Sequence, residues 1–174
     1  MKQEDTKEKI IKKALELFAK NGYDAVSVGE IAKAVGIKAP SLYSHYSSKQ
    51  AIFDAIVEYA ASRYEKYTDE IDIHVQDAKK DIGVFFKVTD EALIKKVRQI
   101  FLYSLRDETI SRFRRMMTIE QFRTKELSAV YTERYVERMI RYHAAIFENL
   151  IAAGEIKNEN PQTLAMMYVA PVIT

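Results

Sequence analysis

The chain has 174 residues, of which 48% are hydrophobic and 30% are charged, a balance that is ordinary for a globular protein and excludes an intrinsically disordered one. It has no cysteine, which excludes disulfides and thiolate metal sites, and no apolar run near the roughly 20 residues that span a bilayer. The net charge of +2 does not by itself indicate nucleic-acid binding. The N-terminus lacks the apolar centre of a signal peptide, so we expect a cytoplasmic protein without a membrane segment.

The first predicted helix begins after Asp5, whose carboxylate can accept a hydrogen bond from a backbone N–H of the first turn. Asn21 and Gly22 end it, because glycine is tolerated where a helix terminates. The apolar residues of this helix recur at helical spacing and form a broad face, which comprises Ile10, Ile11, Ala14, Leu15, Leu17 and Phe18. We therefore expect this helix to pack against others through one side.

Residues 27–50 have the signals of a helix-turn-helix, with three helix starts and one tight turn in a short span. Ser27 and Glu30 have the spacing of a capping box, which predicts a helix start near Val28. Gly36 can take the positive φ that ends a helix, and Pro40 suits the first turn of the next helix. A second capping box, Ser47 with Gln50, predicts the start of a third helix in this stretch.

The second of these helices has one apolar and one polar side. Its apolar side should face the preceding helix and comprises Ile37, Leu42 and Tyr46. Its outward residues are Ser41, Ser44 and His45, with Tyr43 at the flank and Lys38 and Lys49 at the two ends. In a helix-turn-helix, such a helix enters the major groove, where its N-terminal residues contact base edges while hydroxyls and cations hold phosphates. The alternative interpretation is a helical corner with a solvated polar face.

These motifs resemble the N-terminal domain of the tetracycline-repressor (TetR/AcrR) family of transcriptional regulators, over residues 9–59. The likeness lies in Gly-Tyr, Ile-Ala-x-x-Val-Gly and Leu-Tyr-x-His-Tyr-x-x-Lys, which occur here in that order within ALELFAKNGYDAVSVGEIAKAVGIKAPSLYSHYSSKQAIFDAI. The resemblance implies a recognition helix around residues 40–44, a DNA-facing helix N-terminus at Ser27, and phosphate contacts at His45 and Lys49. The predicted DNA-binding residues are Ser27, Lys38, Ala39, Pro40, Ser41, Tyr43, Ser44, His45 and Lys49.

Beyond this region the pattern predicts further helices and no sheet. We expect them over residues 48–67, 75–88, 90–105, 109–122, 126–153 and from 162 onward, with an Asp-rich loop at 68–74. The helix over 126–153 has apolar residues on too wide an arc for one partner, so two of its faces should be buried. The last helix stops at Thr174 while still apolar. The resembled family usually has more chain here, which implies a truncated last helix. The predicted class is all-α, with a three-helix DNA-binding domain over residues 1–48 and a ligand-binding and dimerisation domain over 49–174.

The second predicted domain is rich in aromatic residues and methionine. The candidate residues for a ligand cavity are Phe86, Phe101, Tyr103, Phe113, Met117, Phe122, Tyr131, Tyr135 and Tyr142. One by one they suit an ordinary core, and together they also suit a cavity between helices for an apolar or aromatic molecule. The family resemblance favours the cavity, because family members sense small ligands in that domain.

No pattern predicts catalysis. His74 and His143 have no convincing partners three or four residues away, so we predict no metal site. No Gly-rich phosphate loop, nucleophile elbow or nucleotide fingerprint is present, so we predict no catalytic residue and no cofactor. A cluster of arginines at 112, 114 and 115 favours a solvated helix face over a DNA contact.

Two functions remain open from the sequence. The first is a ligand-responsive transcriptional repressor that binds a palindromic double-stranded operator as a homodimer, with an apolar or aromatic effector. Its dimer would form through the helix over 126–153 and the last helix, and its half-sites would lie about 34 to 36 Å apart or at a multiple of that spacing. The second is a helical dimer that binds a small molecule or a protein and has lost operator binding. An enzyme ranks third.

Overall fold

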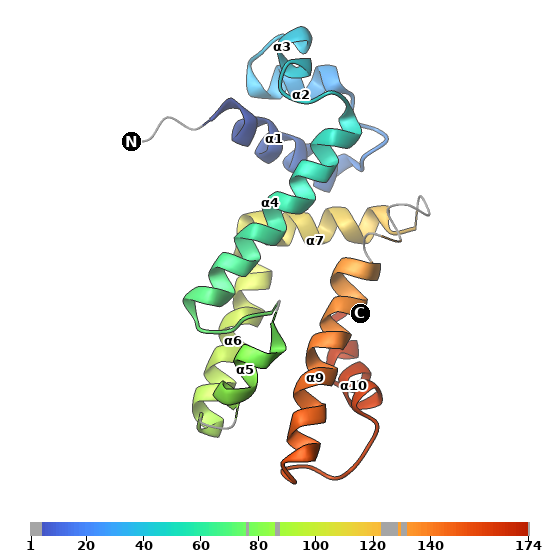
Figure 1. Cartoon of the computed structure of the whole chain (residues 1–174). Coiled ribbons are helices and arrows are strands. Elements are labelled where there is room, and N and C mark those ends of the chain that lie inside the picture. The colour runs from blue at the N-terminus through green and yellow to red at the C-terminus, as the bar shows by residue number, and fades with distance from the viewer. Residues whose placement is uncertain (1–4, 76, 86–87, 123–128, 130–131, 174) are drawn as a thin grey trace. The chain divides into compact units, whose positions relative to one another are not determined.

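Every regular element in the described part of the chain is helical, which confirms the predicted all-α class (Figure 1). The structure is a computed structural model and describes residues 5–75, 77–85, 88–122, 129 and 132–173. Its helices are α1 (Thr6–Asn21), α2 (Val28–Val35), α3 (Ala39–Tyr43), α4 (Lys49–Glu70), α5 (Ala78–Phe85), α6 (Asp90–Arg106), α7 (Glu108–Glu120), the π-helical η1 (Thr132–Glu137), α9 (Arg138–Ala152) and α10 (Pro161–Ile173). The predicted starts near Val28 and at Asp90 are confirmed.

The helices form two compact units. The first, which we call the head unit, comprises Met1–Tyr64 and Leu102–Leu127, and the second, the C-terminal unit, comprises Glu65–Phe101 and Ser128–Thr174. This division differs from the domain boundary predicted between residues 48 and 49. The head unit is larger because α4 buries Phe53 and Ile56 and α7 buries Phe113, so these helices share its core. The predicted assignment of residues 49–174 to ligand binding and dimerisation is a division by function and stays a prediction.

The caps predicted for α1 and α2 are confirmed. Asp5 accepts a hydrogen bond from the N–H of Lys7, and α1 ends at Gly22, where φ is 83°. At α2, the Ser27 hydroxyl accepts from the Glu30 N–H at 3.2 Å, and the Glu30 carboxylate accepts from the Ser27 N–H at 2.7 Å. Gly36, with φ 81° in the left-handed region, ends α2 and turns the chain toward α3.

The predicted cap of α4 was wrong by one residue. The hydroxyl that accepts from the third backbone N–H of the helix belongs to Ser48, at 3.0 Å from the Ala51 nitrogen, and α4 begins at Lys49. Gln50 does not close the predicted box with Ser47, and its side-chain amide instead donates to Asp54 and accepts from Tyr23. A pattern of Ser followed three residues later by Gln therefore misled the prediction.

Three other predicted boundaries differ from the structure. Helix α4 continues through Thr68, which is fully buried and donates its hydroxyl to the Glu65 carbonyl at 2.9 Å inside the helix. Helix α5 is shorter than the predicted span of 75–88 and starts after Asp77, whose carboxylate accepts from the Lys79 N–H. In place of one helix over 126–153, the described residues form the π-helical η1 followed by α9, and part of the predicted start lies outside the described residues.

A buried carboxylate organises the C-terminal unit. Asp81 is 1% exposed and accepts hydrogen bonds from the backbone N–H of His74 at 2.7 Å, from the His74 ring and from the Tyr142 hydroxyl. It thereby connects α5, the loop before it and α9.

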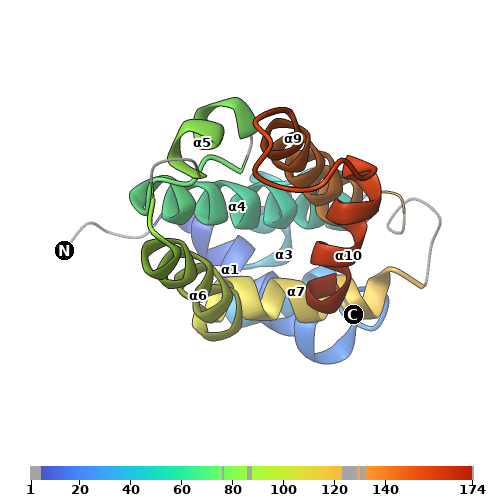
Figure 2. The ribbon, with the colours of Figure 1, turned by 90° about the horizontal axis from the view of Figure 1, so that it is seen from below.

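Helices α9 and α10 lie side by side, where the ring of His143 lies 4.8 Å from that of Tyr168 (Figures 1 and 2). Burial lowers the pKa of His143, although its hydrogen bond to the Met139 carbonyl opposes that shift.

The corrected α4 cap leads to a direct test. Ser48→Ala should lower the free energy of unfolding by about 1 kcal/mol, because the Ala51 N–H loses its acceptor. Ser47→Ala is the matched control, since Ser47 is the exposed neighbour of the same type, and it should change stability by less than about 0.5 kcal/mol. Urea denaturation followed by circular dichroism measures both. An equal or larger loss of unfolding free energy in Ser47→Ala would contradict this assignment and favour Ser47 as the cap.

Candidate nucleic-acid interface

Helix α3 presents a short polar face. Ser41, Tyr43 and Ser44 are exposed, with Tyr43 52% exposed, and His45 is half-buried. The opposite side of the helix carries Leu42, which is fully buried in the head unit. The predicted sides are confirmed for Leu42, Ser41 and Ser44, whereas Ile37, Tyr46 and His45 are half-buried.

The hydroxyls on this face differ in their remaining capacity to donate hydrogen bonds. Ser44 donates its hydroxyl hydrogen to the Ser41 carbonyl at 2.7 Å, so toward a ligand it retains mainly its acceptor lone pairs. The side chains of Ser41 and Tyr43 are exposed to solvent. Tyr43 in particular presents a phenol that can donate to a phosphate or to a base edge.

The N-terminal end of α3 is open. Lys38 occupies the N-cap position without a side-chain cap, and both Lys38 and Pro40 are exposed while Ala39 is half-buried. The Lys38 ammonium thus lies on a long, solvated side chain at the edge of the polar face. It suits a contact with the phosphate backbone better than one with a base edge.

Ser27 is already used within its own capping box. Its hydroxyl accepts from the Glu30 N–H and donates to the Glu30 carboxylate at 2.7 Å. Hydrogen bonds from the Ser27 backbone and hydroxyl lower the pKa of Glu30, which keeps a negative charge beside this helix start. A phosphate contact by the Ser27 side chain would have to compete with that carboxylate, so its predicted role stays a prediction.

Lys49 has a structural role that the sequence did not reveal. Its ammonium donates to the carbonyls of Tyr23 at 2.9 Å and Val26 at 3.0 Å, and it lies 4.3 Å from the centre of the Tyr23 ring. An ammonium has three N–H donors, so two of them hold the connection between α1 and α2, and one can still reach a phosphate. The predicted phosphate contact stays a prediction, and it would be made by a cation that the fold already holds in place.

Tyr23 is the other residue that sequence reasoning missed. Its ring lies 5.2 Å from Phe18 and 5.4 Å from Phe53, its hydroxyl donates to Gln50, and its N–H donates to the Glu120 carboxylate at 2.9 Å. Glu120 is 1% exposed and follows Tyr23 by 97 positions. No local pattern predicts a pair at that separation, and only its place at the end of α7 brings the carboxylate here.

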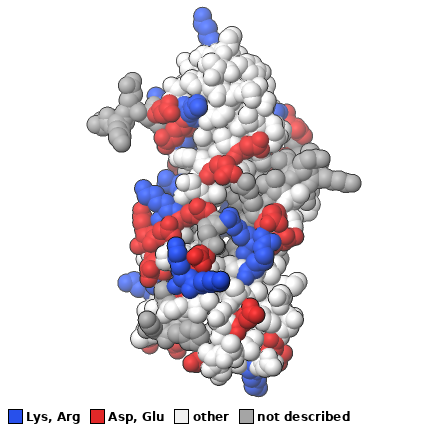
Figure 3. Space-filling model, in the orientation of Figure 1, with Lys and Arg blue, Asp and Glu red and all other residues white. Residues whose placement is uncertain are grey.

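Charge is sparse on the visible side of the end formed by α2 and α3 (Figure 3). On the side of the molecule shown in Figure 3, the end formed by α2 and α3 is mostly uncharged, apart from a basic side chain at its tip. A neutral surface of hydroxyl and phenol groups with cations at its margin suits readout of base edges, flanked by phosphate contacts.

The predicted ligand residues lie in several different surroundings. Phe113 and Met117 are buried in the core of the head unit, whereas Phe101 is 52% exposed and Phe122 86% exposed. Phe86, Tyr131 and the side chain of Tyr135 lie outside the described residues. The remaining two candidates, Tyr103 and Tyr142, each form a hydrogen bond. Tyr103 donates to the Arg63 carbonyl at 3.4 Å, and Tyr142 donates to Asp81. Their role as a cavity lining stays a prediction.

Neither a metal centre nor a membrane-spanning helix occurs among the described residues. No three His, Asp or Glu side chains come together there in a way that could hold a metal ion. The same residues include no helix that has both the length and the apolar character needed to cross a membrane.

Comparison with known proteins gives its clearest match over this interface. Residues 10–56 match the profile of the family described as bacterial regulatory proteins, tetR family. The chain is 46% identical over 52 residues to the biofilm operon icaADBC HTH-type negative transcriptional regulator IcaR of Staphylococcus aureus (strain Newman). That match covers 30% of this chain and 28% of the relative's length, so the chain matches less than a third of this relative.

Solved structures extend the likeness to most of the fold. The flavonoid-responsive regulator FrrA is 25% identical with a TM-score of 0.62, over 92% of this chain and 75% of that one. AibR, crystallised with isovaleryl coenzyme A and operator DNA, is 20% identical with a TM-score of 0.65, over 97% and 84%. The AibR match shows a shared fold. Residues 10–56 are therefore similar to the tetR family of bacterial regulatory proteins, and most of the chain shares the helical fold of solved regulators.

Proposed function

We propose that this protein is a ligand-responsive transcriptional repressor that binds a palindromic operator as a homodimer in the cytoplasm. The observation that carries the proposal is the polar face of α3, where Ser41 and Tyr43 are exposed while Leu42 anchors the helix in the core. A helix-turn-helix uses a face of this kind to read base edges from the major groove.

The names of similar proteins support this assignment. IcaR is a negative transcriptional regulator, FrrA responds to flavonoids, and AibR was crystallised with operator DNA and an acyl coenzyme A. These properties belong to those proteins. For this chain they favour regulation of transcription over catalysis and make a small-molecule effector a reasonable expectation.

We infer that Ser41 contacts base edges and that Tyr43, His45, Lys38 and Lys49 contact phosphates. One head should bury only about 600 to 1,000 Å² against DNA, as single small DNA-binding modules do. Two heads bound to one palindrome raise affinity and specificity, because the second contact becomes intramolecular. A two-fold dimer then requires half-sites about 34 to 36 Å apart, or a multiple of that distance.

We infer that the dimer forms through α9 and α10. Three large apolar residues of α10 are exposed within the single chain: Met166 (58%), Met167 (71%) and Tyr168 (48%). Contiguous exposed apolar residues of this kind are typical of interaction sites. A four-helix arrangement, with α9 and α10 from each subunit, would cover them.

We further infer that the effector is an apolar or aromatic small molecule bound by the C-terminal unit. The effector can regulate DNA binding only if its affinity differs between the DNA-binding conformation and another one. Direct binding measurements with apolar and aromatic compounds, with and without operator DNA, test this inference through that difference.

The DNA contacts have a quantitative test. Genomic fragments selected by the full chain supply the operator duplex, and its affinity should fall steeply as salt rises, because bound phosphates release counterions. Lys38→Ala should lower the slope of log K against log salt by about 1. Lys157→Ala, at an exposed position of the C-terminal unit, is the charge-matched control and should leave the slope unchanged.

In the same assay, Tyr43→Phe should weaken operator binding without changing the thermal unfolding of the protein, because Tyr43 is exposed and outside the core. If neither Lys38→Ala nor Tyr43→Phe alters binding to any selected duplex, the assignment of α3 as the recognition helix fails.

The dimer has its own test. Met167→Glu places a charge on an apolar residue of α10 that is 71% exposed, and it should convert the dimer to a folded monomer with much weaker operator binding. Phe122→Glu is the control, because Phe122 is 86% exposed but lies in the head unit. Sedimentation velocity reports the oligomeric state. A Met167→Glu protein that stays dimeric would exclude this part of α10 from the interface.

A further inference from the structure

Helix α7 is attached at its N-terminal end to α4. Asp107, the N-cap of α7, accepts from the backbone N–H groups of Thr109 and Ile110. The same carboxylate accepts from the Arg63 guanidinium of α4, from Nε at 3.1 Å and from Nη2 at 2.6 Å. Burial tends to raise the pKa of Asp107, but the bonds from Arg63 and from the helix N–H groups outweigh it, so the pKa is lowered. The carboxylate therefore stays ionised near neutral pH and holds two elements together.

Helix α7 is attached at its C-terminal end to the support of the recognition helix. The Glu120 carboxylate accepts from the N–H of Tyr23, and the carbonyl of Tyr23 accepts from the Lys49 ammonium at the start of α4. Between its two ends, α7 packs against α1 and buries apolar side chains that include Phe113 and Met116. Helix α7 thus connects two places on the head that both determine where α3 lies.

The two attachments differ in how easily they can be released. Glu120 is 1% exposed, and separating a buried carboxylate from its donor is strongly unfavourable. The side chain of Arg63 is 45% exposed and that of Asp107 12% exposed, so water reaches this pair more easily than it reaches Glu120. The Arg63–Asp107 pair is therefore the releasable end and Glu120 the fixed one.

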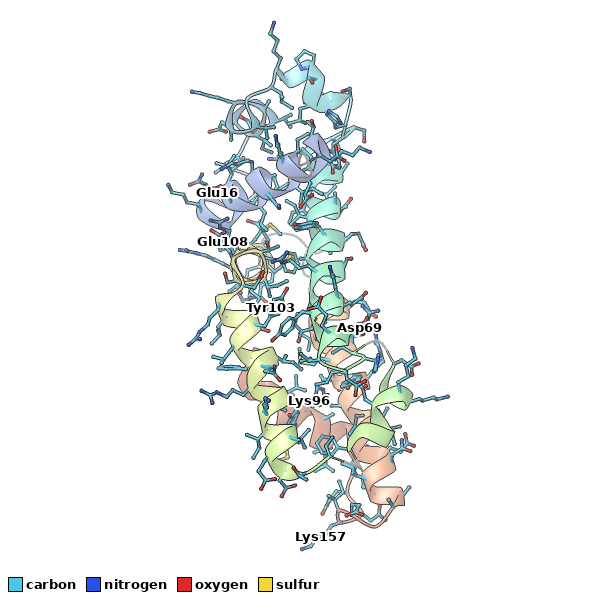
Figure 4. All side chains as sticks on the ribbon, turned by 90° about the vertical axis from the view of Figure 1, so that its left-hand side faces the viewer. Glu16, Asp69, Lys96, Tyr103, Glu108 and Lys157 are labelled. Atoms are coloured by element: carbon cyan, nitrogen blue, oxygen red, sulfur yellow. The ribbon has the colours of Figure 1, made fainter. Side chains whose placement is uncertain are left out.

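The releasable end lies where the chain enters and leaves the head unit. The chain leaves that unit after Tyr64 and returns at Leu102, which places one crossing next to Arg63 and the other next to Tyr103. Tyr103 points from α6 toward α4 (Figure 4), where its hydroxyl donates to the Arg63 carbonyl and its ring lies 6.3 Å from that of Tyr64. Both crossings therefore adjoin Arg63 or a residue that contacts it.

A small tilt of α4 about residue 63 displaces the start of that helix, which lies nearer to α3. Residues 49 and 63 are separated by about 21 Å along α4, at 1.5 Å per residue, so a tilt of about 5° moves the far end by about 2 Å. Helix α3 follows any such movement, because Leu42 and the start of α4 share the core of the head unit.

We propose that α7 positions the recognition helix and that the Arg63–Asp107 pair is the latch through which this positioning is released. The inference rests on the proposed DNA binding and goes beyond it by naming the residues that transmit the signal. Arg63 and Asp107 are positioning residues, because they act on DNA only through α4.

The latch is tested in the full-length chain with substitutions that keep α7 capped. Arg63→Gln removes the guanidinium, and Asp107→Ser removes the charge while retaining a good N-cap. Each should weaken operator binding at least about fivefold, the lower end of typical coupling between sites, and the double variant should be no weaker than either single variant. The salt dependence should keep its wild-type slope, because no phosphate contact is lost.

Two controls separate positioning from general loss of stability. Arg112→Gln breaks the 2.5 Å ion pair of Arg112 with Glu108, which joins residues within α7 alone, and operator affinity should stay unchanged. Ile110→Val trims a residue of α7 that is 4% exposed and costs stability while leaving the latch intact. It should also retain operator affinity at temperatures where the head is folded.

Amide hydrogen exchange on the DNA-free chain gives a readout that does not depend on an operator. Exchange in α3 and the first part of α4 should rise in both latch variants, and in neither control. Wild-type exchange and wild-type affinity in Arg63→Gln and Asp107→Ser would overturn the latch. If the wild-type chain binds no duplex, the proposed function fails, while the exchange data still decide whether the latch exists.

Discussion

Helix α3 is too short to hold its own shape, and the rest of the head unit follows from that constraint. Helix α3 has five residues, and isolated helices of fewer than about 12 residues are marginal in water. Its backbone hydrogen bonds begin at the Lys38 carbonyl, which accepts from the N–H groups of Ser41 and Leu42, and no side chain caps it. Its orientation is therefore set by Leu42 in the core. Whatever moves that core moves the polar face.

The core that holds α3 extends well beyond the family match at residues 10–56. Lys49 binds the carbonyls of the connection between α1 and α2, and Glu120 from α7 binds the N–H of Tyr23 in the same connection. The unit that presents the polar face thus includes α7, which comes from a distant part of the chain. The orientation of the polar face therefore depends on a helix that lies far away in the sequence.

Local signals in the sequence predicted the local structure well. Asp5, Ser27 with Glu30, and Gly36 act through backbone groups within a few residues, so their spacing alone identifies the ends of α1 and α2. The α4 cap failed for a tertiary reason, since Gln50 bonds to Tyr23 and Asp54 instead of closing a box with Ser47.

The candidate site could be predicted only in part. The exposed residues of α3 follow from helical periodicity once Leu42 is assigned to the core. The partners of Lys49 and Glu120 could not be found, because their contacts join residues 23 and 97 positions apart, where spacing carries no information. The same holds for Asp107, whose bond to Arg63 depends on how two helices meet.

The account depends most on the polar face of α3 meeting the groove of a duplex, and one measurement addresses that directly. The chain has no cysteine, so Ser41→Cys introduces a unique thiol on that face, and Asn158→Cys introduces one at an exposed position of the C-terminal unit. The account predicts that operator DNA slows alkylation of the thiol at position 41 and leaves the thiol at position 158 unaffected. Equal alkylation of position 41 with and without saturating operator would contradict it.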